Sequence, residues 1–151
     1  MPIVTDTGFR PDDLNHGFTD IEELPANGPV AIDVAPDADL APVLARLDDA
    51  TAIRVAFPSF ADGRGFSIAR QLRRAGYQGR LRATGHVIAD QYAMARRAGF
   101  DEVEIDDDLA ARQPEDQWLA RAQWQAHDYQ ARLGRARDSG SRSGDPDVQP
   151  A

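Results

Sequence analysis

The chain has 151 residues and a formal net charge of −8, enough length for one domain with a hydrophobic core. This acidic balance disfavours general binding to nucleic acid or to anionic membranes. The chain has no cysteine, and all 17 of its basic residues are arginine. Disulfides, thiol catalysis, zinc–thiolate sites and Schiff-base chemistry on lysine are therefore excluded.

Neither end of the chain carries a membrane or export signal. No apolar run approaches the ~20 residues of a membrane-spanning helix, and the first residues lack a basic stretch followed by an apolar one. We therefore expect a cytoplasmic protein.

Strands and helices alternate along most of the sequence. Residues 1–29 are rich in turn-forming types and predict an irregular N-terminal segment. Apolar alternation predicts strands, and periodic apolar stripes predict helices. The predicted strands are residues 30–35, 51–57, 80–84 and 102–105, and the intervening helices are 37–49, 66–75 and 87–98. Such alternation predicts parallel βα units in one α/β domain over residues 30–133.

The C-terminal part predicts one more helix. Residues 114–133 begin with Pro114, which suits a first helical turn, and place Trp118 and other apolar residues on one face. Trp124 lies off this face and is expected to be an exposed contact. Residues 134–151 are Gly, Ser, Arg, Asp and Pro for the most part, which predicts a disordered tail.

Each predicted strand has one apolar and one polar face. The polar face carries Asp33, Arg54, Arg82 and Glu104. A doubly wound sheet is covered by helices on both faces and is apolar on both. We therefore expect helices mainly on one side of a curled, mostly parallel sheet, like half of a (βα)8 barrel. A flavodoxin-like doubly wound sheet is the alternative. The polar face would then be paired internally, covered by the C-terminal helix, or used for binding.

The charges are unevenly distributed. Residues 63–89 contain six arginines and neither Asp nor Glu, whereas the remaining residues hold 25 acids and 11 arginines. The fold must bring the basic and acidic segments together or leave a dipolar surface. On the helix over residues 66–75, Arg70, Arg73 and Arg74 lie opposite the apolar stripe. A solvated helix face is the simpler interpretation, and a docking surface for an acidic protein is the other.

A short motif recurs 23 residues apart. Arg73-Arg74-Ala75-Gly76-Tyr77 is repeated as Arg96-Arg97-Ala98-Gly99-Phe100. Arginine favours the negative end of a helix, and glycine adopts the left-handed conformation just beyond it. The repeat therefore predicts two similar helix ends.

The best candidate site follows the strand over residues 51–57. Its turn, Pro58 to Gly65, joins a strand to a helix start, where unpaired N–H groups attract anions. Arg64 and the neighbouring amides could hold sulfite, sulfate, phosphate or carboxylate. The alternative is an Arg64 that pairs with Asp62, with glycines that serve only the turn. The predicted ligand-binding residues are Ser59, Asp62, Gly63, Arg64, Gly65, Ser67 and Gln91.

His86 and Asp90 are the weaker, catalytic candidates. His86 follows the third predicted strand, and Asp90 lies four residues on, within reach on a helix. A plain surface or capping histidine is the other interpretation. The acidic run at residues 106–108 could hold a hard cation, although a solvated turn suits it better. No metal site, flavin fingerprint or nicotinamide fingerprint is found, so we expect no cofactor.

The sequence around the candidate site resembles a known family. The stretch from Phe57 to Arg70, Leu81-Arg82-Ala83-Thr84-Gly85, Asp90-Gln91 and Arg97-Ala98-Gly99-Phe100-Asp101 are similar to the domain-of-unknown-function 934 family. Members of that bacterial family are encoded beside assimilatory sulfite reductase. The resemblance implies a role in sulfate assimilation and supplies no catalytic residues.

Two functions follow as expectations. The first is a non-catalytic accessory protein of sulfite reduction that binds the reductase or an oxyanion. The second is a small enzyme of sulfur assimilation, with Asp62, Arg64, His86 and Asp90 converging at the strand ends. A homodimer that pairs two open sheet faces is a further possibility.

Overall fold

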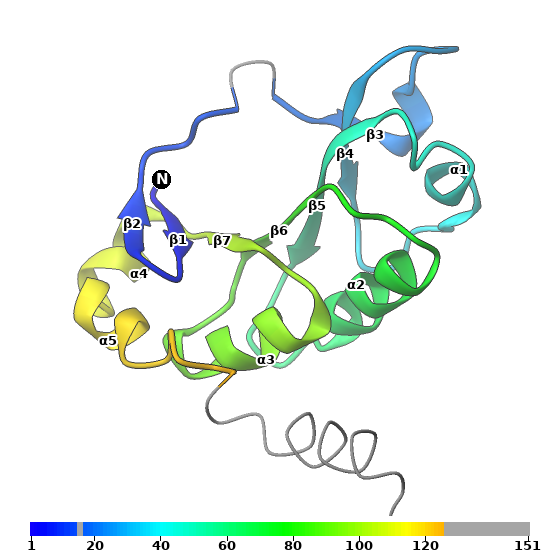
Figure 1. The fold of residues 1–151 in the computed structure, drawn as a ribbon. Helices are drawn as coiled ribbons and strands as arrows, with labels where there is room; N and C mark the ends of the chain where they lie inside the picture. Colours follow the sequence, from blue (N-terminus) through cyan, green and yellow to red (C-terminus); the bar gives the residue numbers. More distant parts are fainter. Residues whose placement is uncertain (15–16, 126–151) are drawn as a thin grey trace, which may run out of the picture.

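The computed structural model describes residues 1–14 and 17–125 as a single sheet with helices packed against it (Figure 1). The strands are β1 (Ile3–Thr5), β2 (Gly8–Arg10), β3 (Thr19–Asp20), β4 (Val30–Val34), β5 (Ala50–Phe57), β6 (Arg80–Gly85) and β7 (Glu102–Glu104). The helices are α1 (Ala41–Leu44), α2 (Arg64–Arg74), α3 (Tyr92–Ala98), α4 (Asp107–Arg112) and α5 (Glu115–Leu119). Two 3₁₀ turns, η1 (Ile21–Glu23) and η2 (Ala89–Gln91), complete the elements.

The strand order explains why the helices gather on one face. The sheet runs β2-β1-β7-β6-β5-β4-β3, with β3 to β7 parallel and β1 and β2 antiparallel. Strands β4 to β7 therefore follow one another in sequence order. Since parallel crossovers are right-handed, successive crossovers in one direction place their helices on the same side. Figure 1 shows α2 and α3 along one face of the sheet.

This arrangement confirms the predicted α/β class with a mostly parallel sheet. The order β4-β5-β6-β7 is that of consecutive barrel units and not of the flavodoxin-like alternative. The sheet stays open, with β2 and β3 at its edges and no closure into a barrel. The apolar strand face and the helices form the core, in which Ile32, Ile53 and Leu81 are fully buried.

The N-terminal segment differs from the sequence expectation. It was expected to be irregular, and instead it supplies β1, β2 and β3. These strands have two or three residues each, too short for an alternating pattern to emerge. β1 pairs with β7, a partner about a hundred residues away, so tertiary contacts decide its conformation.

Two predicted helices differ from the structure in their described parts. The helix predicted over 37–49 is reduced to α1, because Arg46 donates to the carbonyl of Pro25 and to Asp49 and holds the chain in turns. Of the helix predicted over 114–133, residues up to 125 form α5 and then turns whose amides bond three residues back. Residues 126–133 and the predicted tail, 134–151, lie outside the described residues.

The acidic run at residues 106–108 forms a helix start that the sequence did not predict. The Asp106 carboxylate accepts a hydrogen bond from the amide of Leu109 at 2.7 Å, and Asp107 and Asp108 lie in the first turn of α4. Acids at these positions stabilise a helix N-terminus. Within residues 1–14 and 17–125, no group of three or more His, Asp or Glu side chains has the arrangement of a metal site. No described helix is both long and apolar enough to span a membrane.

Candidate functional site

The candidate loop lies at the carboxyl edge of the parallel strands, where ligands bind in open α/β sheets. It comprises residues 58–64, from the end of β5 to the first residue of α2, and we call it the edge loop. Gly65, in the first turn of α2, packs directly on the ring of Phe57 at the end of β5. A Cβ at Gly65 would overlap that ring, so only glycine lets the helix start this close to the strand.

Arg64 is paired with Asp62, the alternative considered from the sequence. Asp62 Oδ1 accepts from the Arg64 amide at 3.1 Å and from Nε at 3.0 Å, and Oδ2 accepts from Nη2 at 2.6 Å. These bonds lower the pKa of Asp62 from 3.8 to about 2. The Arg64 side chain is 56% exposed. The carboxylate of Asp62 therefore occupies the position that an incoming oxyanion would take.

Gln91 holds the backbone of the edge loop through hydrogen bonds. Its Nε2 donates to the carbonyl of Phe60 at 2.9 Å, while its Oε1 accepts from the amide of Ile88 at 3.1 Å. The loop is closed further by a turn in which the Asp62 amide donates to the carbonyl of Ser59 at 3.1 Å. Gln91 therefore acts on the loop backbone and joins β5 to the segment after β6.

The front of the edge loop is open to solvent. Phe60 is 39% exposed, and its ring stands edge-on to the His86 ring with 5.0 Å between centroids. The exposed His86 is held at its backbone, where its amide donates to the carbonyl of Phe57 at 2.8 Å. The edge loop, whose backbone is held by hydrogen bonds, thus presents Phe60 and the Arg64 guanidinium, with His86 packed beside Phe60.

The four side chains of the enzyme alternative have separate partners. Asp62 pairs with Arg64, His86 contacts Phe60, and Asp90 pairs with Arg121 at 2.6 Å. Of the other predicted ligand-binding residues, Ser59 and Gly63 are exposed on the loop. Ser67 and Arg64 line an open groove of about 560 Å³ between α1 and α2.

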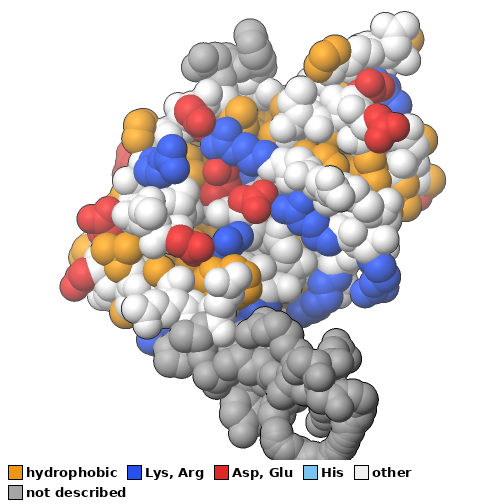
Figure 2. Space-filling model, viewed as in Figure 1, with side chains coloured by type: hydrophobic (Ala, Val, Ile, Leu, Met, Phe, Trp, Pro, Cys, Tyr) orange, Lys and Arg blue, Asp and Glu red, His pale blue; other side chains and the backbone are white. Residues whose placement is uncertain are grey.

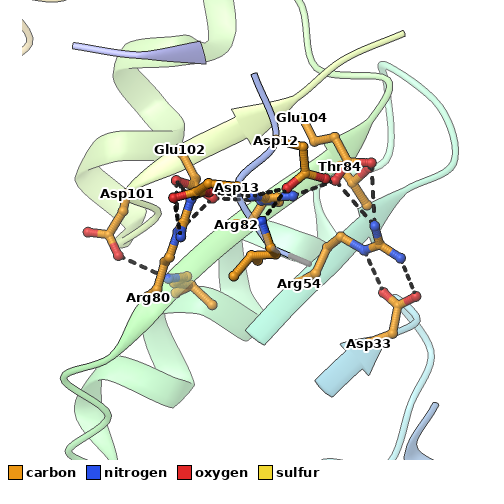
Figure 3. A network of polar contacts seen from close by, with 12 residues as sticks. Asp12, Asp13, Asp33, Arg54, Arg80, Arg82, Thr84, Asp101, Glu102 and Glu104 are labelled. Atoms are coloured by element: carbon orange, nitrogen blue, oxygen red, sulfur yellow. Dashed lines mark hydrogen bonds and ion pairs between the residues drawn. The ribbon is translucent and has the colours of Figure 1, made fainter. Parts of the chain in front are cut away.

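The polar face of the sheet is a second cluster of charged side chains, and it is paired internally (Figure 3). We call it the sheet-face network; it comprises Asp33, Arg54, Arg80, Arg82, Thr84, Glu102 and Glu104. Arg54 on β5 and Arg82 on β6 are register partners, which places two like charges opposite each other. Glu104 offsets the repulsion between these two arginines, because its carboxylate accepts hydrogen bonds from Arg54 at 3.2 Å and from Arg82 at 2.8 Å.

Arg82 is the centre of the network and has no solvent exposure. Its Nε donates to Glu102 at 2.6 Å, its Nη1 to Glu104, and its Nη2 to Asp12 at 3.2 Å. Burial alone would lower the pKa of Arg82, but the hydrogen bonds that Arg82 donates to Asp12 and Glu102 raise it above its ordinary value. A buried guanidinium with this many carboxylate partners stabilises the fold only while its partners remain.

The N-terminal segment completes the network, a contribution that sequence reasoning missed. Asp12 bonds Arg82, and Asp13 bonds Arg80 through short contacts. Phe18 covers both neighbouring guanidinium groups, with its ring centroid 4.3 Å from Arg54 Cζ and 5.5 Å from Arg82 Cζ. The polar face is therefore paired internally and is covered, within the part of the chain that the structure describes, by residues before β3.

Part of the basic segment, residues 63–89, lies against acidic residues from the rest of the described chain, which is one of the two arrangements expected from the sequence. Arg80 and Arg82 bond carboxylates of the N-terminal segment and of β7, and Figure 2 shows acidic and basic side chains side by side in the middle of the face in view. The two clusters differ in the exposure of their arginines: Arg82, at the centre of the sheet-face network, is fully buried, whereas the Arg64 side chain is 56% exposed.

One family matches this chain. The model of a family described as bacterial protein of unknown function (DUF934) matches residues 31–138, which include β4 from Ala31 onward, β5 to β7, the edge loop and all seven residues of the sheet-face network. No curated protein matches the chain. The match covers more than half of the sequence, so the chain belongs to the DUF934 family of bacterial proteins.

Proposed function

We propose that this chain is a non-catalytic accessory protein of assimilatory sulfite reduction, which binds the sulfite reductase through its edge loop. The pathway comes from what the family resemblance implies, since relatives are encoded beside that reductase. The binding role comes from geometry. The observation that supports the binding role is the hydrogen bond from Gln91 to the Phe60 carbonyl, which fixes the loop backbone while the Phe60 ring stays exposed.

A fixed, exposed aromatic loop suits protein binding for a thermodynamic reason. Ordering a loop on binding costs free energy, and a loop that is already held avoids most of that cost. Phe60, His86 and Arg64 combine an aromatic surface with a cation, which is the composition enriched in interface centres. The reductase would therefore contact Phe60 and Arg64 of the edge loop together with the neighbouring His86, and the loop would keep its conformation on binding.

The same geometry favours binding over the enzyme alternative and over a free oxyanion. Catalysis by Asp62, Arg64, His86 and Asp90 requires these side chains to converge, whereas only Asp62 and Arg64 contact each other, His86 contacts Phe60 and Asp90 pairs with Arg121. An oxyanion at Arg64 would have to displace Asp62, which already makes a bidentate pair there. Neither a homodimer nor a cytoplasmic location follows from these contacts; light scattering on the purified chain tests the first.

The test is the affinity of the purified chain for purified assimilatory sulfite reductase, measured by biolayer interferometry. We expect the wild type to bind and Phe60→Ala to weaken binding at least about tenfold, as for an aromatic hot spot. Leu119→Ala is the matched control, because Leu119 is an apolar residue of similar exposure, 40%, on α5 and outside the edge loop. No binding by the wild type, or equal losses in the two variants, would overturn the proposal.

A genetic test addresses the pathway separately. Deletion of the gene is expected to impair growth with sulfate or sulfite as sulfur source and to leave growth on cysteine intact. Normal growth of the deletion strain on sulfite would contradict a role in this pathway.

A further inference from the structure

The repeated motif folds into two equivalent helix ends. In the first, the Tyr77 amide donates to the carbonyl of Leu72 at 3.1 Å; in the second, the Phe100 amide donates to that of Ala95 at 3.0 Å. Gly76 and Gly99 follow the helices with φ of 104° and 121°. Both ends are therefore glycine caps of the same type, and corresponding arginines occupy corresponding positions.

The first arginine of each motif has a structural role. Arg73 donates to the carbonyls of Tyr77, Gly79 and Gly99 and to Asp101. Arg96 donates to the carbonyl of Phe100 and to Asp6, and its guanidinium lies 4.8 Å from the Trp124 ring centroid. These contacts tie the ends of α2 and α3 to neighbouring loops.

The second arginine of each motif has no such partner. Arg74 and Arg97 are exposed, and no hydrogen bond or ion pair joins either side chain to the rest of residues 1–14 and 17–125. Arg70, one turn before Arg74, is exposed in the same way. Met94, one turn before Arg97, is 46% exposed. We call these four residues, Arg70, Arg74, Met94 and Arg97, the helix-layer patch.

The helix-layer patch is continuous across two helices. α2 and α3 pack side by side on the same face of the sheet (Figure 1). Their buried stripes, Phe66, Ala69 and Leu72 on α2 and Tyr92, Ala95 and Ala98 on α3, point to the sheet, so the patch residues point away from it. Figure 2 shows basic side chains over α2.

The patch carries one sign of charge on a protein of the opposite sign. The chain has a net charge of −8, yet residues 63–89 contain no acid. Surfaces without a binding role usually mix both signs. Arginine and methionine are also enriched in interface centres, and each guanidinium can hold a carboxylate bidentately.

We propose that Arg70, Arg74, Met94 and Arg97 form a docking surface for an acidic segment of a partner protein. The arginines take carboxylates of that segment, and Met94 takes an apolar side chain between them. The surface lies on the helix layer, away from the edge loop, and does not depend on the proposed role in sulfite reduction. Its attraction for the segment falls as salt rises, because the charges are exposed.

The probe is a fluorescein-labelled peptide, Glu-Glu-Leu-Glu-Glu, titrated with the full chain in 50 mM NaCl and followed by fluorescence anisotropy. The wild type should bind it, and the Arg74→Gln/Arg97→Gln variant should bind at least about tenfold more weakly, since two charge-assisted contacts are lost. A peptide with Gln in place of each Glu should not bind.

The matched control is Arg10→Gln/Arg112→Gln, which removes two other exposed arginines and changes the net charge equally. It should change the affinity less than about twofold, the effect of long-range charge alone. Equal losses in the two variants, or no binding by the wild type, overturn the proposal. Analytical ultracentrifugation adds one more outcome: self-association that disappears in Arg74→Gln/Arg97→Gln would assign the patch to a second copy and overturn the acidic partner.

Discussion

The sheet-face network and the edge loop use the same pairing of arginine and carboxylate in opposite ways. On the sheet face, Arg82 is fully buried and bonds three carboxylates from β7 and the N-terminal segment. In the edge loop, the 56% exposed Arg64 bonds a carboxylate two residues away. Burial makes the first arrangement necessary for folding, because a charge left without its partner cannot reach water. The second can be broken with little effect on the fold, which leaves its residues available to a partner.

The largest expected effect is at Arg82. Arg82→Met leaves Glu102 and Glu104 without their central cation and should lower the free energy of unfolding by about 3–5 kcal/mol. Urea unfolding followed by circular dichroism measures this. Arg74→Met, on the exposed helix-layer patch, is the control and should stay within about 0.5 kcal/mol of wild type. Similar losses in both variants would remove the distinction between buried and exposed arginines.

The turn at the end of β6, which contains Gly85, should be nearly as sensitive to substitution. Gly85, at the end of β6, has φ of 106°, and a Cβ there would lie 2.6 Å from the carbonyl oxygen of Phe57. Gly76 has φ of 104°, with no atom near the Cβ position. Gly76→Ala should cost about 1–3 kcal/mol of stability from backbone strain alone. Gly85→Ala should cost more, and the difference between the two urea midpoints isolates the clash with β5.

Arg73 and Arg74, the two arginines of the first repeated motif, should contribute differently to the free energy of unfolding. Arg73→Ala loses its bonds to three carbonyls and Asp101 and should lower the unfolding free energy by about 1.5–3 kcal/mol. Arg74→Ala should remain close to wild type, because its side chain is exposed. Thermal unfolding of the two purified variants compares them directly. A larger loss at Arg74 would mean that its role is structural after all.

The smallest expected effect is a titration in the edge loop. The pKa of Asp62 is lowered to about 2, mainly by its bonds to Arg64. The stabilisation that this pair contributes is therefore complete above pH of about 3.8, and it is lost as the pH falls through about 2. Arg64→Ala should return this pKa toward 3.8. Carbon-13 NMR of the Asp62 carboxyl follows the change. A pKa that stays near 2 without Arg64 would assign the shift to other groups.

Local pattern predicted much of the fold but only part of the polar contacts. Alternation within β4, β5 and β6 predicted one apolar and one polar face, because side chains alternate strictly along a strand. It could not predict that Glu104 bridges Arg54 and Arg82, which depends on the register of three strands. Asp12 and Asp13 lie in a segment with no periodicity, so nothing local indicated their partners.

The edge loop shows the same division between local and distant contacts. The pairing of Asp62 with Arg64 was foreseeable, because the two residues are two apart in a turn. The bond from Gln91 to the Phe60 carbonyl was not, because it joins two connections that meet only when β5 and β6 pair. The ion pair between Asp90 and Arg121 was not foreseeable either, because the two residues are 31 apart in sequence.

A matched pair of isosteric substitutions tests the central contrast most directly. Glu104→Gln and Asp62→Asn each remove one negative charge from an arginine pair without changing side-chain shape, and urea unfolding compares them under one condition. We expect Glu104→Gln to lower the urea midpoint clearly, because Glu104 is buried between Arg54 and Arg82. Asp62→Asn should lower the midpoint much less, because solvent screens the exposed Asp62–Arg64 pair. Equal decreases in both variants would contradict the assignment of the sheet face to folding and of the edge loop to binding.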